Sequence, residues 1–480
     1  MHVALGVWLV IPPAEGFSCG RGPRCGVPRG QRVSLVTRRQ TPRRNLEPVP
    51  ATVPVVRPRV EARFLPVWFT CVAADWLQGP YLYTLYADRG LSSYMIAKLF
   101  AVGFVSSAAL GAIAGRLCDQ IGRRRGCLLY CAICCVSCIL THSLDLGLLV
   151  FSRLLGGIAD SLLHTAFEAW AIEEHKQCPA PPQALNRLLS RMWSGSWLVA
   201  IFSGIIGSLA VSALPRQLCN LRLEGVDLRL VCGGPVAAFD LAALCCVIGA
   251  LLIMWTWPAQ EPHLPDLESS IRWGPPKPRS VRPDLARWLR GFAGIRKVIT
   301  DPVILYGAIT AAFEGALFVF VFNWSPLLLH GWPGLAPHLG LVFALFMSCC
   351  AGGSFCFKYL SELWSPAKLL MPILIMASAS LSGAAYAAHT NSALAALAAC
   401  LLFEVAVGMY FPCTSSLKSD MVPDRIRGLV YSLYRVPLNM LALGVLLGVP
   451  SQDSALALCA VVLMLVAAWT AMVRRRGDSA

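Results

Sequence analysis

The chain contains 480 residues, of which 56% are hydrophobic and 14% are charged. Soluble domains carry about 25% charged residues, so this composition excludes an ordinary soluble fold. The net charge of +15 does not indicate nucleic-acid binding, because the basic residues fall in the connections between apolar runs, as they do under positive-inside topology. The lipid bilayer is therefore the expected partner of the chain, and nucleic acid is excluded.

The first 63 residues differ from the rest of the chain. They are rich in proline and arginine and poor in acids, and their apolar start at 3–11 is too short to span a bilayer. This composition is typical of a disordered cytoplasmic tail, which we favour, or of an organelle targeting peptide. The segment 1–63 is therefore predicted to be a separate region.

Twelve apolar spans of helical length begin at Leu65, and a basic linker at 258–300 divides them six and six. The sequence thus predicts an all-α membrane protein with twelve transmembrane helices in two six-helix bundles, at 64–257 and 301–473, and a basic tail at 474–480. The expected spans are 65–87, 94–117, 127–142, 147–172, 192–214, 233–257, 302–329, 337–360, 366–388, 392–416, 428–449 and 454–473.

A short arginine-rich loop, Gly115–Gly126, connects the second and third spans. Its sequence is Gly-Arg-Leu-Cys-Asp-Gln-Ile-Gly-Arg-Arg-Arg-Gly. Arginines stay out of the hydrocarbon, so the loop orients the hairpin and places both termini in the cytoplasm. The pattern resembles the loop between helices two and three of the major facilitator superfamily. That resemblance predicts a gating loop, whose candidate residues are Gly115, Asp119, Gly122, Arg123 and Arg124.

Acidic residues recur at a near-constant offset in the two halves. Asp75 and Glu314, in spans one and seven, are 239 residues apart, and Glu168 and Glu404, in spans four and ten, are 236 apart. Such an offset indicates two parallel repeats. Ionisable groups inside a membrane are costly, so these acids are candidate proton carriers.

The fourth span carries a polar stripe. At 100° per residue its charged and small residues fall along one face of the helix, with a cation, two acids and a histidine. This arrangement suits a path for substrate and protons, while structural pairing with neighbouring helices is the alternative. The stripe consists of Arg153, Gly156, Gly157, Asp160, His164 and Glu168.

Two arginines are the main candidates for binding an anion, because guanidinium is a permanent, planar donor fork. They are Arg153 and Arg435, while Arg191 is a weaker candidate because it starts span five and marks the membrane boundary. Tyr431 and Asn439 share the helical face of Arg435 and join the substrate-binding set. Gln78 lies one turn from Asp75 in span one, where Pro80 is able to interrupt the helix.

The 20 cysteines do not form the pattern of a disulfide framework. Many lie inside apolar runs, where cysteine behaves as a small apolar residue. Cys131 and Cys134 have metal-like spacing, but no histidine or second pair accompanies them. No nucleophile–base constellation appears either. The sequence therefore predicts no metal, no cofactor and no enzyme.

Several phrases together resemble the molybdate-anion transporter family of the major facilitator superfamily, over Leu65 to Val473. The phrases are Ala73-Ala-Asp-Trp-Leu-Gln-Gly-Pro-Tyr-Leu-Tyr83, Phe167-Glu-Ala-Trp170, Phe313-Glu314 with Phe318-Val-Phe-Val-Phe322, Tyr410-Phe-Pro412 and Tyr434-Arg-Val-Pro437. The resemblance implies uptake of molybdate, a tetrahedral dianion, across the plasma membrane. The arginine-rich start departs from this family and leaves a plastid or other organelle membrane as the alternative.

The resulting hypothesis is a facilitator that moves molybdate by alternating access, with proton symport as the driving force. A facilitator for another solute, such as sulfate, a sugar or an organic anion, is the first alternative. A non-transporting membrane sensor is the second. The intact acids in both halves favour transport, because an idle bundle has no need for such costly groups.

Overall fold

The computed structural model describes residues 60–176, 182–223, 226–258, 301–421, 427–449 and 451–478. The predictions for residues 1–59 and for most of the linker therefore lie outside the described residues. Within the described ranges the side chains of some helical and strand residues are also outside them, namely 110–117, 119–120, 176, 182–184, 186, 221–228, 301–303, 418–421, 427–433, 435–436 and 474–478.

The described part of the chain contains helix in each of the twelve predicted spans, which confirms the twelve-helix architecture. Eight of these helices are long and apolar enough to cross a bilayer within their described residues alone. The first half comprises α2 (Val60–Gln78), η1 (Gly79–Tyr81), α3 (Leu82–Ala87), α4 (Ser93–Ile121), α5 (Arg123–Leu140), α6 (Leu146–Lys176), α7 (Pro182–Ala213) and α8 (Val236–Thr256). The second comprises α11 (Asp301–Gly331), η2 (Pro333–His338), α12 (Leu339–Leu363), α13 (Pro366–His389), α14 (Ala393–Met421), α15 (Arg427–Gly448) and α16 (Gln452–Asp478).

The first span is interrupted as its sequence predicts. Helix α2 ends at Gln78, a turn of 3₁₀-helix containing Pro80 follows, and α3 continues to Ala87. Proline lacks a backbone N–H and its ring crowds the preceding turn, so a regular α-helix does not run through it easily. The interruption lies beside the site described below.

The turn between α4 and α5 is a single residue, Gly122, with φ of 92°. Only glycine adopts this backbone region without strain. Its N–H donates to the carbonyl of Cys118 and its own carbonyl accepts from the N–H of Gly126, at 3.1 and 3.0 Å. The glycine therefore lets two long helices follow one another with no intervening loop.

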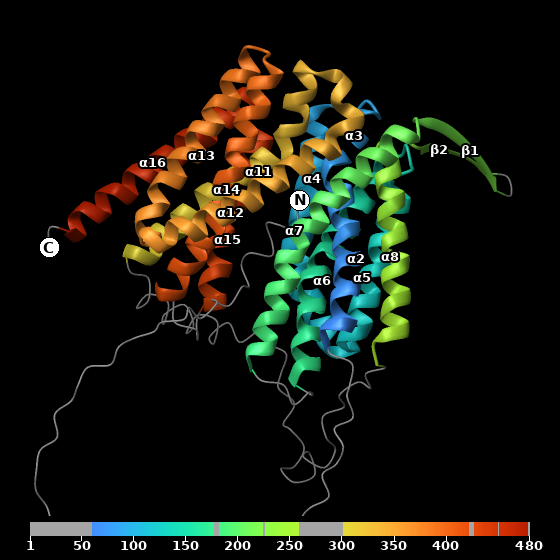
Figure 1. The fold of residues 1–480 in the computed structure, drawn as a ribbon. Coiled ribbons are helices and arrows are strands. Elements are labelled where there is room, and N and C mark those ends of the chain that lie inside the picture. The colour runs from blue at the N-terminus through green and yellow to red at the C-terminus, as the bar shows by residue number, and fades with distance from the viewer. Residues whose placement is uncertain are drawn as a thin grey trace, which may run out of the picture.

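A β-hairpin joins α7 to α8, an element that the sequence analysis did not predict. Strands β1 (Gln217–Leu223) and β2 (Val226–Cys232) pair antiparallel, and Figure 1 shows them projecting away from the helices. The N–H of Val231 donates to the carbonyl of His142 at 2.8 Å, which ties the base of the hairpin to the end of α5.

The two halves contact each other along α7 and α12, along α4 and α15, and where α3 meets α11. Figure 1 shows the helices of the halves meeting near α3 and diverging toward the far end of α7. We call the meeting region, built from η1, η2 and the adjoining ends of α7 and α12, the closed end. There α7 and α12 cross at two glycines, since a Cβ on Gly204 would lie 2.4 Å from the carbonyl oxygen of Gly340.

The closed end is held by hydrogen bonds that cross between the halves. The hydroxyl of Tyr81 donates to the carbonyl of Pro337 and accepts from the N–H of Gly340, both at 3.0 Å. The hydroxyl of Ser208 donates to the same Pro337 carbonyl at 3.2 Å. The Tyr81 hydroxyl thus both donates and accepts a hydrogen bond across the boundary between the halves.

Aromatic rings form a second layer across the halves. Phe318 and Phe322 of α11 meet Phe104 and Phe100 of α4 edge-on, with ring centroids 4.7 and 5.1 Å apart, and Tyr83 contacts Phe322 at 5.7 Å. Edge-to-face aromatic pairs each contribute about 0.5–1.5 kcal/mol beyond their burial. The layer therefore helps to hold the two halves together around the cavity described next.

Candidate functional site

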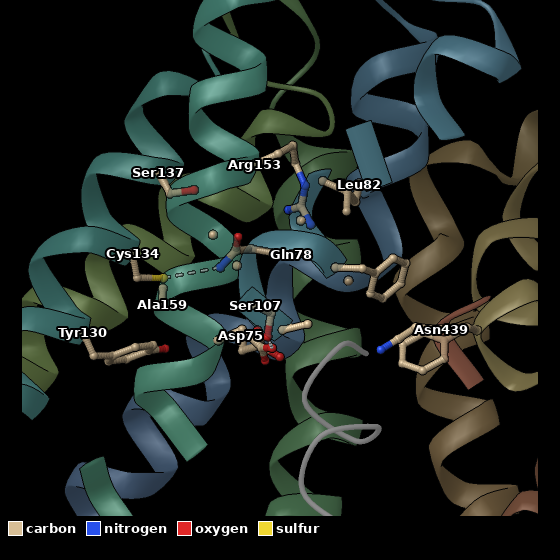
Figure 2. A pocket seen from close by; sticks show the side chains of 18 of the residues that line it. Asp75, Gln78, Leu82, Ser107, Tyr130, Cys134, Ser137, Arg153, Ala159 and Asn439 are labelled. Carbon is tan, nitrogen blue, oxygen red and sulfur yellow. Dashed lines mark hydrogen bonds between the residues drawn. The ribbon is translucent and has the colours of Figure 1, made fainter. Parts of the chain in front are cut away.

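A cavity of about 1060 Å³, the part open to solvent included, lies between the two halves. Of the twenty lining residues that the structure describes, sixteen come from α2 to α6 and four come from α11 and α15. Polar side chains from both halves enter it, and Figure 2 shows them from close by. The lining includes eight of the residues singled out in the sequence, namely Asp75, Gln78, Arg153, Gly156, Gly157, Asp160, Glu314 and Asn439.

Arg153 brings a positive charge to the cavity. It projects from α6, it is only 7% exposed, and in Figure 2 its guanidinium points toward Gln78 and Leu82. The guanidinium carbon lies 5.9 Å from the centre of the Phe100 ring, within cation–π range. Among the lining residues that the structure describes, Arg153 is the only arginine or lysine.

Three carboxylates also line the cavity. Asp160 of α6 accepts a hydrogen bond from the hydroxyl of Ser107 at 2.8 Å, and Asp75 of α2 interacts electrostatically with both Asp160 and Arg153. Glu314 enters from α11 in the other half, and the hydroxyl of Tyr410 donates to it at 3.5 Å. The acids therefore face the same cavity as the arginine, from both halves.

Neutral polar groups complete the wall. The amide of Gln78 donates to the carbonyl of Ala74 at 2.9 Å and to the sulfur of Cys134 at 3.6 Å. Asn439 enters from α15, and Figure 2 shows its side chain pointing into the cavity from the second half. The hydroxyl of Tyr130 donates a hydrogen bond to the carbonyl of Cys71 at 2.9 Å.

The remaining residues of the predicted proton path, one histidine and two glutamates, are not among the described lining residues of the cavity. His164 does not line it but contacts a lining residue, since its Nδ1 is 2.8 Å from the carbonyl oxygen of Asp160 and 3.5 Å from a carboxylate oxygen of the same residue. Glu168 continues the stripe beyond the lining residues of α6. Glu404 is buried in α14 near Cys350 and Cys400. The stripe on α6 thus enters the cavity over its first half only.

Four predicted residues have side chains outside the described set, namely Tyr431, Arg435, Gly115 and Asp119. The weaker candidate Arg191 is placed far from the cavity. Its guanidinium forms an ion pair with Glu61 at 2.9 Å and is 62% exposed, as expected of a residue at the membrane boundary.

The remaining predicted gating residues connect helices. Arg123 donates to the carbonyl of Ala169 in α6, and Arg124 donates to the carbonyl of Met254 in α8 at 3.2 Å. Both arginines follow directly on Gly122. The loop therefore binds the start of α5 to two other helices of the same half.

Sequence reasoning missed the contribution of α4 and α5 to the cavity. Ser107 and Gly103 come from α4, and Cys134 and Ser137 come from α5. These are small or weakly polar residues in apolar runs, so their composition carried no signal of a site. The spacing of Gly103 and Ser107, which places two small residues on one face of span two, is the signal that would have found them.

Comparison with known proteins adds to this geometry. A family model described as sugar transporters with 12 transmembrane segments matches residues 50–272 and 283–403. A protein of Danio rerio named molybdate-anion transporter is 33% identical over 398 residues, which cover 80% of this chain and 78% of the relative. A protein of Xenopus tropicalis with the same name is 31% identical over 394 residues, covering 79% and 76%.

This chain belongs to the molybdate-anion transporter family of the major facilitator superfamily. Members of the family are transporters, so the chain is a multi-pass membrane transporter and not an enzyme. The resemblance drawn from its sequence phrases is thereby confirmed.

Solved structures agree with the fold. A bacterial homologue of the iron transporter ferroportin superposes with a TM-score of 0.63 at 13% identity, covering 86% of this chain and 98% of that one. The nucleoside transporter NupG superposes with a TM-score of 0.60 at 10% identity, covering 86% and 98%. At these identities the match concerns the twelve-helix fold alone.

Proposed function

We propose that this protein carries molybdate across a membrane by alternating access, coupled to protons. The observation that carries the proposal is the cavity between the halves, in which Arg153 faces polar groups of α2 and α15. The names of the relatives in Danio rerio and Xenopus tropicalis support molybdate as the substrate.

An oxyanion requires a cation in such a place. A dianion that leaves water for a membrane interior loses its hydration, and this loss is offset only by a charge and by hydrogen-bond donors. The guanidinium of Arg153 supplies both, with a planar fork that fits two oxygens of one anion. The amide of Asn439 lies on the opposite wall, so one bound anion reaches both halves.

The carboxylates of the cavity determine the coupling. Asp75, Asp160 and Glu314 repel a dianion while they are ionised and stop repelling it once they bind protons. Accumulating a dianion against an inside-negative potential costs about 4.6 kcal/mol per 100 mV, at roughly 2.3 kcal/mol for each charge. Protons bound together with the anion cancel this cost, which gives the acids of the cavity a role in symport.

The closed end gives the protein one of the two states that alternating access requires. Tyr81 and Ser208 hold the closed end by hydrogen bonds between the halves, and the cavity begins immediately beside them at Gly79 and Leu82. Releasing the closed end while the opposite ends of the helices come together exposes the same residues to the other side. The bound anion, which touches both halves, favours the passage between the two states.

We place the closed end outside and the Arg123–Arg125 end in the cytoplasm, following the positive-inside rule, with both termini cytoplasmic. The membrane of residence is the plasma membrane in this proposal, and an organelle membrane is the alternative. Tags at the C-terminus and in the linker 258–300 test the orientation. Detection of either tag from outside unpermeabilised cells contradicts it.

The substrate is tested by uptake of molybdate in cells that lack their own carrier, with sulfate as competitor. Expression of the protein should raise saturable molybdate uptake, and a molar excess of sulfate should reduce it only weakly. Uptake of sulfate in preference to molybdate would assign the protein to another oxyanion. Uptake of no solute, with normal insertion in the membrane, would favour the sensor.

A further inference from the structure

Helix α4 approaches the Arg153 guanidinium at a glycine. A Cβ built on Gly103 would lie 2.6 Å from one terminal nitrogen of Arg153, 3.3 Å from its guanidinium carbon and 3.4 Å from Nε. Gly103 itself is buried and lines the cavity. The guanidinium therefore occupies space that exists only because residue 103 has no side chain.

We propose that Gly103 is a positioning residue of the oxyanion site, which fixes where the Arg153 guanidinium stands in the cavity and thereby sets the affinity for a tetrahedral dianion. This proposal rests on the function proposed above. It adds a residue of α4 that contributes no polar atom of its own and acts through the arginine of α6.

The position of the guanidinium matters because its hydrogen bonds to an anion are short and directional. Charge-assisted N–H···O bonds are about 2.7–2.9 Å long, and the bidentate pairing of a guanidinium with an oxyanion holds only in one relative orientation. A methyl group at residue 103 would lie 2.6 Å from the terminal nitrogen, which is closer than the two atoms can approach, so the fork turns or withdraws. An anion held by Asn439 on the other wall then keeps at most one of the two bonds.

The same substitution is predicted to leave the fold intact. The atoms that a Cβ on Gly103 would meet all belong to the far part of one long side chain, which moves at little cost. Gly157 is the instructive contrast, since its Cβ would lie 2.4 Å from the backbone carbonyl oxygen of Gly103. There the helices α4 and α6 themselves have to separate.

Gly383 supplies the matched control. It lies within helix α13 of the second half, it is not among the residues that line the cavity, and its Cβ would lie 3.6 Å from the Cβ of Ala399. This is an ordinary contact. Gly383→Ala therefore adds the same methyl group within a helix of the bundle without approaching the guanidinium.

The test is the concentration dependence of molybdate uptake by proteoliposomes containing wild type, Gly103→Ala or Gly383→Ala. Gly103→Ala should raise the KM roughly tenfold, as expected for the loss of one charged hydrogen bond, with a Vmax within about twofold of wild type. Gly383→Ala should change neither. A KM for Gly103→Ala equal to that of wild type, or a matching rise in both variants, overturns the proposal.

A double-mutant cycle separates positioning from damage to the fold. Lysine at residue 153 has no terminal fork to be displaced, so Gly103→Ala should add little to the effect of Arg153→Lys. Additive effects of the two substitutions would show that Gly103 acts elsewhere and would overturn the proposal.

Failure of the proposal is distinguishable from failure of the proposed function. If wild-type protein carries molybdate and Gly103→Ala carries it with unchanged KM, only the role of Gly103 is wrong. If the wild type carries sulfate in place of molybdate, the same cycle with sulfate decides the role of Gly103. If the wild type carries neither anion, both proposals fail.

Discussion

The two walls of the cavity differ although the two halves are built from related repeats. The first half supplies most of the lining and with it Arg153, Asp75, Asp160 and the small residues of α4 and α5. Among the described residues, the second half supplies only Glu314 and Asn439 with two apolar side chains, Phe318 and Leu438. In the proposed function, the first half therefore supplies the charge that binds the anion, and the second half supplies Asn439 on the facing wall.

The paired acids, by contrast, are placed alike in the two halves. Asp75 and Glu314 occupy matching positions in the sequence and both line the cavity, whereas Glu168 and Glu404 match in the same way and neither is among the described lining residues. Each pair therefore keeps the same relation to the cavity in both halves. The comparison makes the two pairs natural controls for each other.

Removing the cation of the first wall should have the largest effect. Arg153→Ala leaves a dianion without its charged hydrogen-bond partner, at a cost of roughly 1.5–3 kcal/mol, so molybdate affinity should fall at least about tenfold. Direct binding to purified protein measures the loss. Arg191→Ala is the control, because that arginine pairs with Glu61 at the surface and should keep wild-type affinity. Equal affinity in the two variants would contradict a binding role for Arg153.

The second-largest effect is expected from neutralising one acid of each pair. Glu314→Gln keeps the shape of the side chain but cannot exchange a proton, so it should abolish pH-dependent accumulation while still exchanging labelled for unlabelled molybdate. Glu404→Gln, away from the cavity, should keep the pH profile of the wild type. Accumulation with an unaltered pH profile in Glu314→Gln would make this residue structural and would transfer the coupling role to Asp75 or Asp160.

A smaller effect is expected at the closed end. Tyr81→Phe deletes two hydrogen bonds between the halves, each contributing about 0.5–1.5 kcal/mol, and should shift the population toward opening of that end. Backbone hydrogen exchange at Gly340 and the adjoining start of α12 should become faster. Tyr83→Phe is the control, since the hydroxyl of Tyr83 bonds to Ser93 within the same half at 3.2 Å. Unchanged exchange in Tyr81→Phe would show that the end is held by packing alone.

The smallest effect concerns a pair outside the cavity in the first half. A hydrogen bond to Asp240, 3.0 Å away, raises the pKa of His142 in the turn after α5. Because the folded-state pKa is raised, the stabilisation is fully present below the unfolded value of about 6.5 and is lost as pH rises through the folded value. Thermal unfolding of the wild type should therefore show a small loss of stability over that range. Asp240→Asn should remove this component, and an identical pH profile in the variant would contradict the assignment.

Sequence reasoning predicted the helices well because their signal is local. Apolar length and the positions of Pro80 and Gly122 determine where helices run, break and turn, and the structure follows them. The hairpin at Gln217–Cys232 was not predicted, because its residues mix charges and apolar groups in a short connection without a strong turn signal. Its pairing depends partly on contact with His142, which lies far away in the sequence.

The candidate site was predictable only in part. Charged residues in apolar spans stand out, and four of those that the sequence singled out line one cavity, namely Asp75, Arg153, Asp160 and Glu314. Which face of each helix meets the cavity depends on packing between helices, so the sequence alone could not show that Glu168 and Glu404 lie outside the cavity wall. The role proposed for Gly103, to leave space for an arginine 50 residues away, could not be predicted from its own span, because it depends on how α4 packs against α6.

The position of the anion tests the central claim most directly. Molybdenum scatters X-rays anomalously, so crystals grown with molybdate locate the metal atom of the anion without reference to the protein density. The account predicts one strong anomalous peak in the cavity, with the oxygens of the anion within hydrogen-bond distance of the Arg153 guanidinium and with Asn439 on the facing wall. A peak elsewhere in the bundle, or saturating molybdate with no peak beside Arg153, would contradict it.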